Sequence, residues 1–291
     1  MKLRRSWIIA LAAGLALAGW VAGSPARALN ALAALNSLRA EEGTAYGPLP
    51  RQRFDLYKPG GAAPARGWPL AVFFYGGSWN KGERGDYRFV GEALAARGIM
   101  VMVADYRLYP EVRYPEFLND CALALAHGLT QAAAWGADPA RVFVMGHSAG
   151  AYNAAMLALD PRWLAGTGHR IDELAGWIGL AGPYDFVPIR NPDVQPVFYH
   201  PNVPPDSQAI RYADTSTLRA FLAAPQADSF VNPVRNTRQM AEHLAAHGAQ
   251  VTLREYPGVN HLSLVGALAL PLRALAPVLA DVTAFVGAAE H

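Results

Sequence analysis

Residues 142–151, which read VFVMGHSAGA, constrain the fold of this chain more than any other stretch. Four apolar residues lead into Ser148, which has a glycine two positions before it and another two positions after it. The apolar run indicates a buried strand, and the glycines leave room for a sharp turn into a helix that presents the hydroxyl. A serine that merely caps a helix also fits the position, but it does not explain both glycines. The segment therefore predicts an α/β chain with Ser148 as a candidate nucleophile.

Short apolar runs alternate with helical patterns along most of the chain. Strands are predicted at residues 54–57, 68–75, 99–104, 142–145, 177–180, 218–223 and 251–256. Helices are predicted at residues 87–97, 115–135, 149–159, 233–247 and 271–286. Strands separated by helices of this length are typical of a mostly parallel sheet covered on both faces. We therefore expect one α/β domain over residues 51–291, preceded by a lead-in segment, 29–50, with a short helix and a loop.

One segment interrupts this alternation. Residues 182–208 contain seven prolines, which exclude a central strand or a long helix. A long loop in a compact domain is usually functional or disordered, and the aromatic residues Phe186, Phe198 and Tyr199 indicate that this one packs. We interpret residues 182–217 as a small cap over the sheet, in which Phe198 and Tyr199 are candidates for substrate contact. A surface excursion without substrate contact is the alternative.

The first 28 residues have the layout of a secretory signal peptide. A basic start is followed by an uncharged apolar run and by the small-residue site Ala26–Ala28. The apolar run is shorter than the roughly 20 residues that span a bilayer, so cleavage after Ala28 is favoured over an uncleaved membrane anchor. We therefore expect export to the periplasm or the outside of the cell.

Charge, cysteine content and the lack of binding motifs argue against a nucleic-acid partner, an internal disulfide and a cofactor. Without residues 1–28, Lys and Arg fall from 25 to 21 while 23 acidic residues remain, so the formal charge changes from +2 to −2. No basic patch remains, which argues against nucleic acid as a partner. The single cysteine, Cys121, permits no internal disulfide, and at 52% hydrophobic residues the core is large enough without one. No cluster has metal-ligand spacing and no loop matches a nucleotide motif, so we expect no cofactor.

A serine hydroxyl needs a base, and the base needs a carboxylate to orient it. His261 follows the predicted strand 251–256, and Asp228 follows the predicted strand 218–223. Both therefore lie beyond the carboxyl ends of strands, where α/β sheets place their ligand chemistry. Asp185, next to the cap, is the competing acid. The order Ser148, Asp228, His261 is the order that hydrolases of this architecture use.

Backbone amides are predicted to stabilise the oxyanion. Two glycines in YGGSW, residues 75–79, follow the predicted strand 68–75 and allow the backbone to approach a substrate closely. We assign the donors of an oxyanion hole to the amides of Gly77, Ser78 and Ala149. Trp79, at the end of this motif, is a further candidate for substrate contact.

Four motifs together resemble the hormone-sensitive-lipase-like and BD-FAE-like carboxylesterases of the α/β-hydrolase superfamily. YGGSW is similar to the His-Gly-Gly-Gly-Trp motif of that group, and Asp105–Glu111 (DYRLYPE) is similar to its Asp-Tyr-Arg-Leu-Ala-Pro-Glu motif. GHSAG resembles its nucleophile elbow, and the segments around Asp228 and His261 resemble its acid and base segments. Tyr75 stands where the group has histidine, and Ser78 stands where a third glycine is usual.

The resemblance implies the α/β-hydrolase fold and a serine carboxylesterase that acts on short-chain or aromatic esters through an acyl-enzyme. An arylformamidase is the first alternative, although the predicted leader argues against that cytoplasmic chemistry. A non-catalytic binding protein of the same fold is the second alternative. It is disfavoured because all three residues of the expected triad are present. The expected partner is a small ester, with membrane association only through an uncleaved leader.

Overall fold

The computed structural model describes residue 30 and residues 40–287, so the predicted leader lies outside the described residues. Eight strands form one sheet in the order β1-β2-β4-β3-β5-β6-β7-β8. They are β1 (Ala40–Ala45), β2 (Arg53–Tyr57), β3 (Trp68–Phe74), β4 (Met100–Ala104), β5 (Ala137–His147), β6 (Gly176–Leu180), β7 (Ala220–Pro225) and β8 (Val251–Tyr256). The pairs β1–β2 and β2–β4 are antiparallel and all others are parallel, which confirms the predicted mostly parallel sheet.

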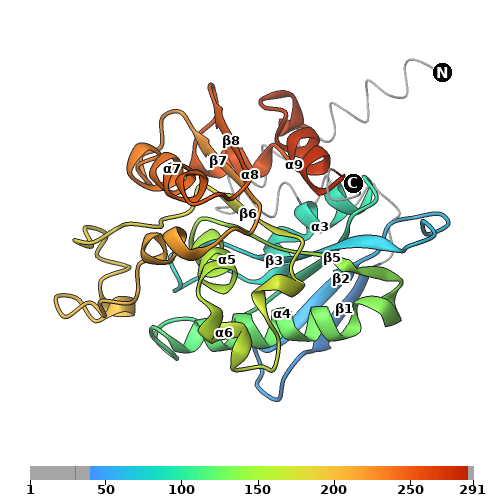
Figure 1. The fold of residues 1–291 in the computed structure, drawn as a ribbon, viewed down its shortest axis with the longest axis horizontal. Coiled ribbons are helices and arrows are strands. Elements are labelled where there is room, and N and C mark those ends of the chain that lie inside the picture. Colours follow the sequence, from blue (N-terminus) through green and yellow to red (C-terminus); the bar gives the residue numbers. More distant parts are fainter. Residues whose placement is uncertain (1–29, 31–39, 288–291) are drawn as a thin grey trace.

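Helices cover both faces of this sheet. The α-helices are α3 (Arg88–Ala95), α4 (Glu116–Trp135), α5 (Ala149–Leu159), α6 (Pro161–Ala165), α7 (Gln239–Ala246), α8 (His261–Gly266) and α9 (Val278–Gly287). Figure 1 shows α4, α5 and α6 together on one side of the sheet, and α3 beside α9 on the other. Every residue of α5 is buried, and its many alanines let this helix lie close to the central strands.

The edge strand β1 was not predicted, because its residues fall in the lead-in segment 29–50, for which a short helix and a loop were expected; residues 31–39 of that segment lie outside the described residues. Ala40 pairs with Tyr57 and Ala45 pairs with Arg53, with a bulge around Gly43. No residue of β1 is buried, so the segment carries none of the apolar alternation by which a strand is recognised. Its conformation is set by hydrogen bonds to β2 and not by local sequence.

The helix predicted at residues 271–286 is also corrected. A short 3₁₀ turn, Leu272–Ala274, comes first, and α9 begins only at Val278. Pro277 explains the break, because proline has no N–H to donate and disfavours the helical conformation in the residue before it. The helix predicted at residues 233–247 is confirmed, although its first turn, Val234–Arg238, is π-helical.

The proline-rich segment 182–217 contains no strand and no α-helix, only 3₁₀ turns at Pro196–Phe198 and Ala209–Thr215. Hydrogen bonds hold it against α5 and against the loop that precedes α4. The hydroxyl of Tyr152 in α5 donates to the carbonyl of Ser207 at 2.7 Å. The amide of Tyr114 donates to the carbonyl of Val197 at 3.0 Å. The segment is therefore held in place although it has little regular structure.

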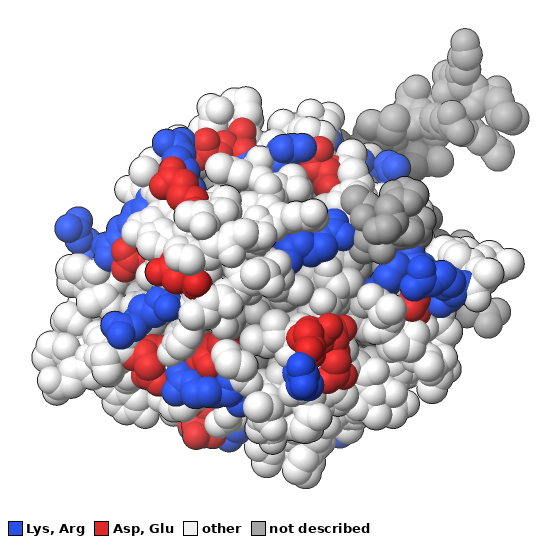
Figure 2. All heavy atoms as spheres, in the orientation of Figure 1, with Lys and Arg blue, Asp and Glu red and all other residues white. Residues whose placement is uncertain are grey.

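The charged side chains of the described part of the chain are interspersed. Figure 2 shows acidic and basic side chains next to one another on the visible face. No helix among the described residues is both long enough and apolar enough to cross a membrane. Within the same residues, no cluster of three or more His, Cys, Asp or Glu side chains is arranged to hold a metal ion.

Candidate active site

Ser148 occupies a strained turn between β5 and α5. Its φ of 55° and ψ of −122° lie in a region that residues with a side chain rarely adopt. Its amide donates to the carbonyl of Leu180 at 2.8 Å. A Cβ on Gly146 would lie 2.1 Å from the Gly150 oxygen, and a Cβ on Gly150 would lie 2.0 Å from the Phe74 oxygen. Both glycines are therefore required for the turn to close.

His261 is the first residue of α8, where the side chain of Asn260 caps the helix by accepting hydrogen bonds from two amides. Its Nε2 lies 2.8 Å from the Ser148 Oγ, and its Nδ1 lies 2.7 Å from Oδ2 of Asp228. A carboxylate can only accept a hydrogen bond, so Nδ1 carries the proton. Nε2 is then free to accept the proton of the Ser148 hydroxyl. This is the tautomer that a general base requires.

Asp228 lies in the loop after β7, with only 1% of its side chain exposed. Its Oδ1 accepts hydrogen bonds from the amides of Phe230 at 2.8 Å and Val231 at 3.1 Å. Burial acts to raise the pKa of Asp228, but the hydrogen bonds from His261 and these amides outweigh it and hold the pKa below its ordinary range. The carboxylate therefore stays ionised beside the imidazole at neutral pH.

The competing acid, Asp185, has a different partner. Its two oxygens accept hydrogen bonds from the guanidinium of Arg235, both at 2.8 Å. The structure thus brings Ser148, His261 and Asp228 into one hydrogen-bonded chain and leaves Asp185 with the proline-rich segment.

Sequence reasoning assigns no role to His147, the residue just before the serine. Its side chain is buried, and Nε2 donates to the carbonyl of His261 at 3.0 Å. Burial, followed by the nearby His261, lowers the pKa of His147 to about 3, so the ring stays neutral. Its Nδ1 is buried without a partner among the described residues. His147 therefore holds the backbone of His261 in place.

The three amides predicted to form an oxyanion hole are unengaged. Within residues 40–287, none of the amides of Gly77, Ser78 and Ala149 donates a hydrogen bond to a carbonyl or side chain. Residues 75–82, which we call the glycine loop, lie against Ser148. A Cβ on Gly76 would be only 2.8 Å from the Ser148 Cβ. The Ala149 amide also opens an eleven-residue helix, whose N-terminus favours negative charge. Donation to an oxyanion stays a prediction, and these free amides are consistent with it.

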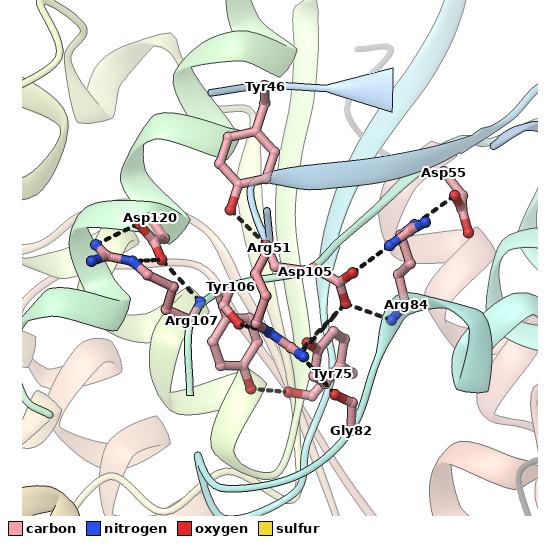
Figure 3. Close-up of polar contacts among 10 residues, drawn as sticks. All are labelled: Tyr46, Arg51, Asp55, Tyr75, Gly82, Arg84, Asp105, Tyr106, Arg107 and Asp120. Atoms are coloured by element: carbon pink, nitrogen blue, oxygen red, sulfur yellow. Dashed lines mark hydrogen bonds and ion pairs between the residues drawn. The ribbon is translucent and has the colours of Figure 1, made fainter. Parts of the chain in front are cut away.

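A buried polar network holds both ends of the glycine loop (Figure 3). The Tyr75 hydroxyl accepts from Nη2 of Arg51 at 2.6 Å and donates to Oδ1 of Asp105 at 2.9 Å. Arg51 also donates to the carbonyls of Tyr106 at 2.9 Å and Gly82 at 2.8 Å. The hydroxyl of Tyr106 donates to the Tyr75 carbonyl at 2.7 Å. Tyr75 therefore ties the start of the loop to a fixed arginine and aspartate.

Two further arginines complete this network around the DYRLYPE motif (Figure 3). Arg84 binds Asp105 and also donates from Nε to Asp55 at 2.8 Å. Arg107 donates from Nε and Nη2 to the buried Asp120, both at 2.8 Å. Each buried carboxylate thus has a cationic partner, which offsets the cost of removing its charge from water.

The residues predicted to touch substrate lie at different depths. Trp79 is 2% exposed, and its Nε1 donates to Oδ1 of Asn153 at 2.9 Å. Phe198 is fully buried and packs edge-on against Trp79, with ring centroids 4.9 Å apart. Tyr199 is 43% exposed, and Arg113 lies over its ring. Trp79 and Phe198 present no open surface here, so their contact with substrate stays a prediction.

Two hollows of the described structure lie away from Ser148. They have volumes of about 400 and 310 Å³ and lie beside α4, the first lined in part by Arg107 and Trp163 and the second by His127 and Thr130. Neither is lined by Ser148, Asp228 or His261. The hydrogen-bonded chain at Ser148 is the stronger indication of function, because it is the arrangement that activates a hydroxyl.

The chain is similar to known esterases. Residues 54–196 match the BD-FAE family model. A probable isoprenylcysteine alpha-carbonyl methylesterase, ICMEL1, of Oryza sativa subsp. japonica is 29% identical over 75% of this chain and 56% of its own length. The esterase LipC of Mycobacterium tuberculosis is 28% identical over 74% of this chain and 58% of its own length. The chain thus spans little more than half of these relatives.

The solved structures show the same fold. A bacterial heroin esterase superposes with a TM-score of 0.69, at 23% identity, over 89% of this chain and 88% of its own. The carboxylesterase EstE1, cloned from a metagenomic library, superposes with a TM-score of 0.69, at 20% identity, over 90% and 94% of the two chains. At these identities the likeness is one of fold, and it confirms the predicted arrangement of sheet and helices.

Proposed function

We propose that the chain is a serine carboxylesterase of the BD-FAE type, a proposal supported by the match of residues 54–196 to the BD-FAE family model. The observation that carries the proposal is the unbroken chain from the Ser148 hydroxyl through His261 to Asp228, with contacts of 2.8 and 2.7 Å. The strained backbone of Ser148 and the unengaged amides beside it add to this support.

In the first half of the reaction, the Ser148 Oγ attacks the ester carbonyl while its proton moves to Nε2 of His261. The ionised Asp228 stabilises the imidazolium that forms, and the amides of Gly77, Ser78 and Ala149 stabilise the negative oxygen. The C–O bond to the alcohol then breaks, and Nε2 gives its proton to the departing oxygen. An acyl group remains on Ser148.

In the second half, water takes the place of the alcohol. His261 accepts a proton from the water as its oxygen attacks the acyl-enzyme, and the same amides receive the second oxyanion. The proton then returns from Nε2 to the Ser148 Oγ as the acid leaves. The proposed cycle uses the three side chains, the backbone amides and one water molecule.

The substrates that we propose are short-chain or aromatic carboxylic esters. The names of two relatives, a methylesterase and an esterase, support the class of bond. We also keep the proposal of export, which rests on the layout of residues 1–28. Processing at Ala28 can be checked by N-terminal sequencing of the protein recovered from its native host.

Hydrolysis of p-nitrophenyl acetate, butyrate and octanoate by the full chain tests the proposal. The wild type should turn over at least the acetate, and Ser148→Ala should lose roughly 10³-fold or more in kcat/KM. A folded wild-type protein that hydrolyses none of the three contradicts it. Turnover of N-formyl aromatic amines without ester turnover would instead favour the arylformamidase alternative.

A further inference from the structure

Exposed apolar side chains gather on the segments that carry the base and the acid. Eight large apolar side chains are exposed in the described part of the chain. Three of them, which we call the apolar rim, are Phe230 at 72%, Leu262 at 54% and Val234 at 54%. Exposed apolar surface of this kind has no role in the core, and where it gathers it is often a binding site.

Two members of the apolar rim are fixed beside the base. The ring of Phe230 lies with its centroid 5.2 Å from that of His261. The amide of Phe230 donates to Asp228 at 2.8 Å, so the carboxylate that orients the base also places this ring. Leu262 follows His261 directly, and its amide is capped by Asn260 at 3.1 Å. The exposed ring of Phe230 thus lies next to the His261 ring, and the exposed Leu262 is the next residue along the chain.

The charged side chains on the two segments that carry the apolar rim are already paired. Arg235 forms two hydrogen bonds of 2.8 Å with Asp185 and a third with the carbonyl of Val187. Asp228 is buried and bound to His261. Residues 226–234 and 257–266 contain no other Lys, Arg, Asp or Glu. The surface therefore favours a neutral apolar group over an anionic or cationic one.

The direction of proton transfer shows which part of an ester reaches this surface. Nε2 of His261 must give its proton to the departing alcohol oxygen, so the alcohol lies on the His261 side of the reacting carbon. We propose that Phe230 and Leu262 form the subsite for the alcohol part of the substrate, and that the preferred substrates are neutral esters of apolar alcohols. This inference rests on the proposed esterase function.

A pair of isomeric esters separates the alcohol side from the acyl side. Hexyl acetate and methyl heptanoate have the same formula and similar hydrophobicity, but they carry the long chain on opposite sides of the carbonyl. Phe230→Ala should lower kcat/KM for hexyl acetate roughly fivefold, the effect of removing about 40 Å² of apolar contact. It should change kcat/KM for methyl heptanoate less than twofold. The ratio between the two esters cancels any general effect on the chemistry.

Two leucine variants extend this test: Leu262→Ala as a second test of the subsite and Leu49→Ala as a control. Leu262→Ala should shift the ratio in the same direction as Phe230→Ala. Leu49 is 37% exposed and lies between β1 and β2, at the other end of the strand order. Leu49→Ala should therefore leave the ratio unchanged. Equal losses on both esters, or a larger loss on methyl heptanoate, overturn the alcohol subsite while the esterase function stands. Absence of all ester turnover in the wild type overturns both.

Discussion

Replacing Tyr75 by phenylalanine tests whether the buried network holds the glycine loop. Tyr75→Phe removes one oxygen from a fully buried ring that lies between Tyr87 and Tyr106, so it leaves the packing of the ring in place. The hydroxyl accepts from Arg51 at 2.6 Å and donates to Asp105 at 2.9 Å. Burial, followed by the charge of Asp105, raises the pKa of Tyr75, so the hydroxyl keeps its proton at every working pH.

Both lost hydrogen bonds involve charged partners, each worth roughly 1.5–3 kcal/mol. Arg51 retains the carbonyls of Tyr106 and Gly82, and Asp105 retains Arg84, so part of this loss is recovered. We therefore expect Tyr75→Phe to lower the free energy of unfolding by about 2 kcal/mol, which corresponds to a Tm decrease of roughly 4–8 °C. A loosened glycine loop should also lower kcat for p-nitrophenyl acetate by about tenfold, with little change in KM.

Urea unfolding and steady-state kinetics measure the two effects. Tyr184→Phe is the matched control, because the Tyr184 hydroxyl is buried without a hydrogen-bond partner within residues 40–287. Its loss should leave stability unchanged or slightly improved. The reasoning is refuted if Tyr75→Phe and Tyr184→Phe have the same stability and the same kcat.

Three further predictions concern the elbow and the base. Asp228→Asn should lower kcat/KM for p-nitrophenyl acetate by roughly 10³–10⁴-fold with the fold retained by circular dichroism, and near-normal activity contradicts the role of the carboxylate. Gly150→Ala places a Cβ 2.0 Å from the Phe74 oxygen, so urea unfolding should show a loss of about 3 kcal/mol or more; a fully stable variant rules out the close contact. The native pKa of His147 is about 3, whereas an unfolded histidine titrates near pH 6.5, so between these values only the unfolded chain takes up the proton. Its contribution therefore makes stability fall on acidification below about pH 6.5, by at most roughly 1.4 kcal/mol per unit, and His147→Gln should flatten this slope; equal slopes in the two proteins refute it.

The central strands were predictable because they are apolar on both faces. Residues of β3, β4 and the second half of β5 are buried almost without exception, so their sequences read as continuous apolar runs. The edge strand β1 has no buried residue and gives no such signal. The break at Pro277 was missed because the surrounding leucines and alanines favour a helix on their own.

The candidate site, like the fold, was predictable only in part. Ser148, Asp228 and His261 each follow a predicted parallel strand, and such strands end at one edge of a sheet, so their proximity follows from the order of elements. The buried polar network beside these residues could not be predicted from the order of elements, because only the folded chain brings Arg51 to Tyr75 and Asp105. Local patterns carry no information on contacts between residues so far apart in the sequence.

Covalent labelling tests the central claim most directly. A p-nitrophenyl alkylphosphonate mimics the tetrahedral intermediate, and attack by an activated serine releases one p-nitrophenol and leaves the phosphonyl group on the chain. Intact mass and peptide mapping should show one label per wild-type chain, placed on Ser148, and none on Ser148→Ala. A folded wild-type protein that stays unlabelled, or a label on another residue, contradicts the account.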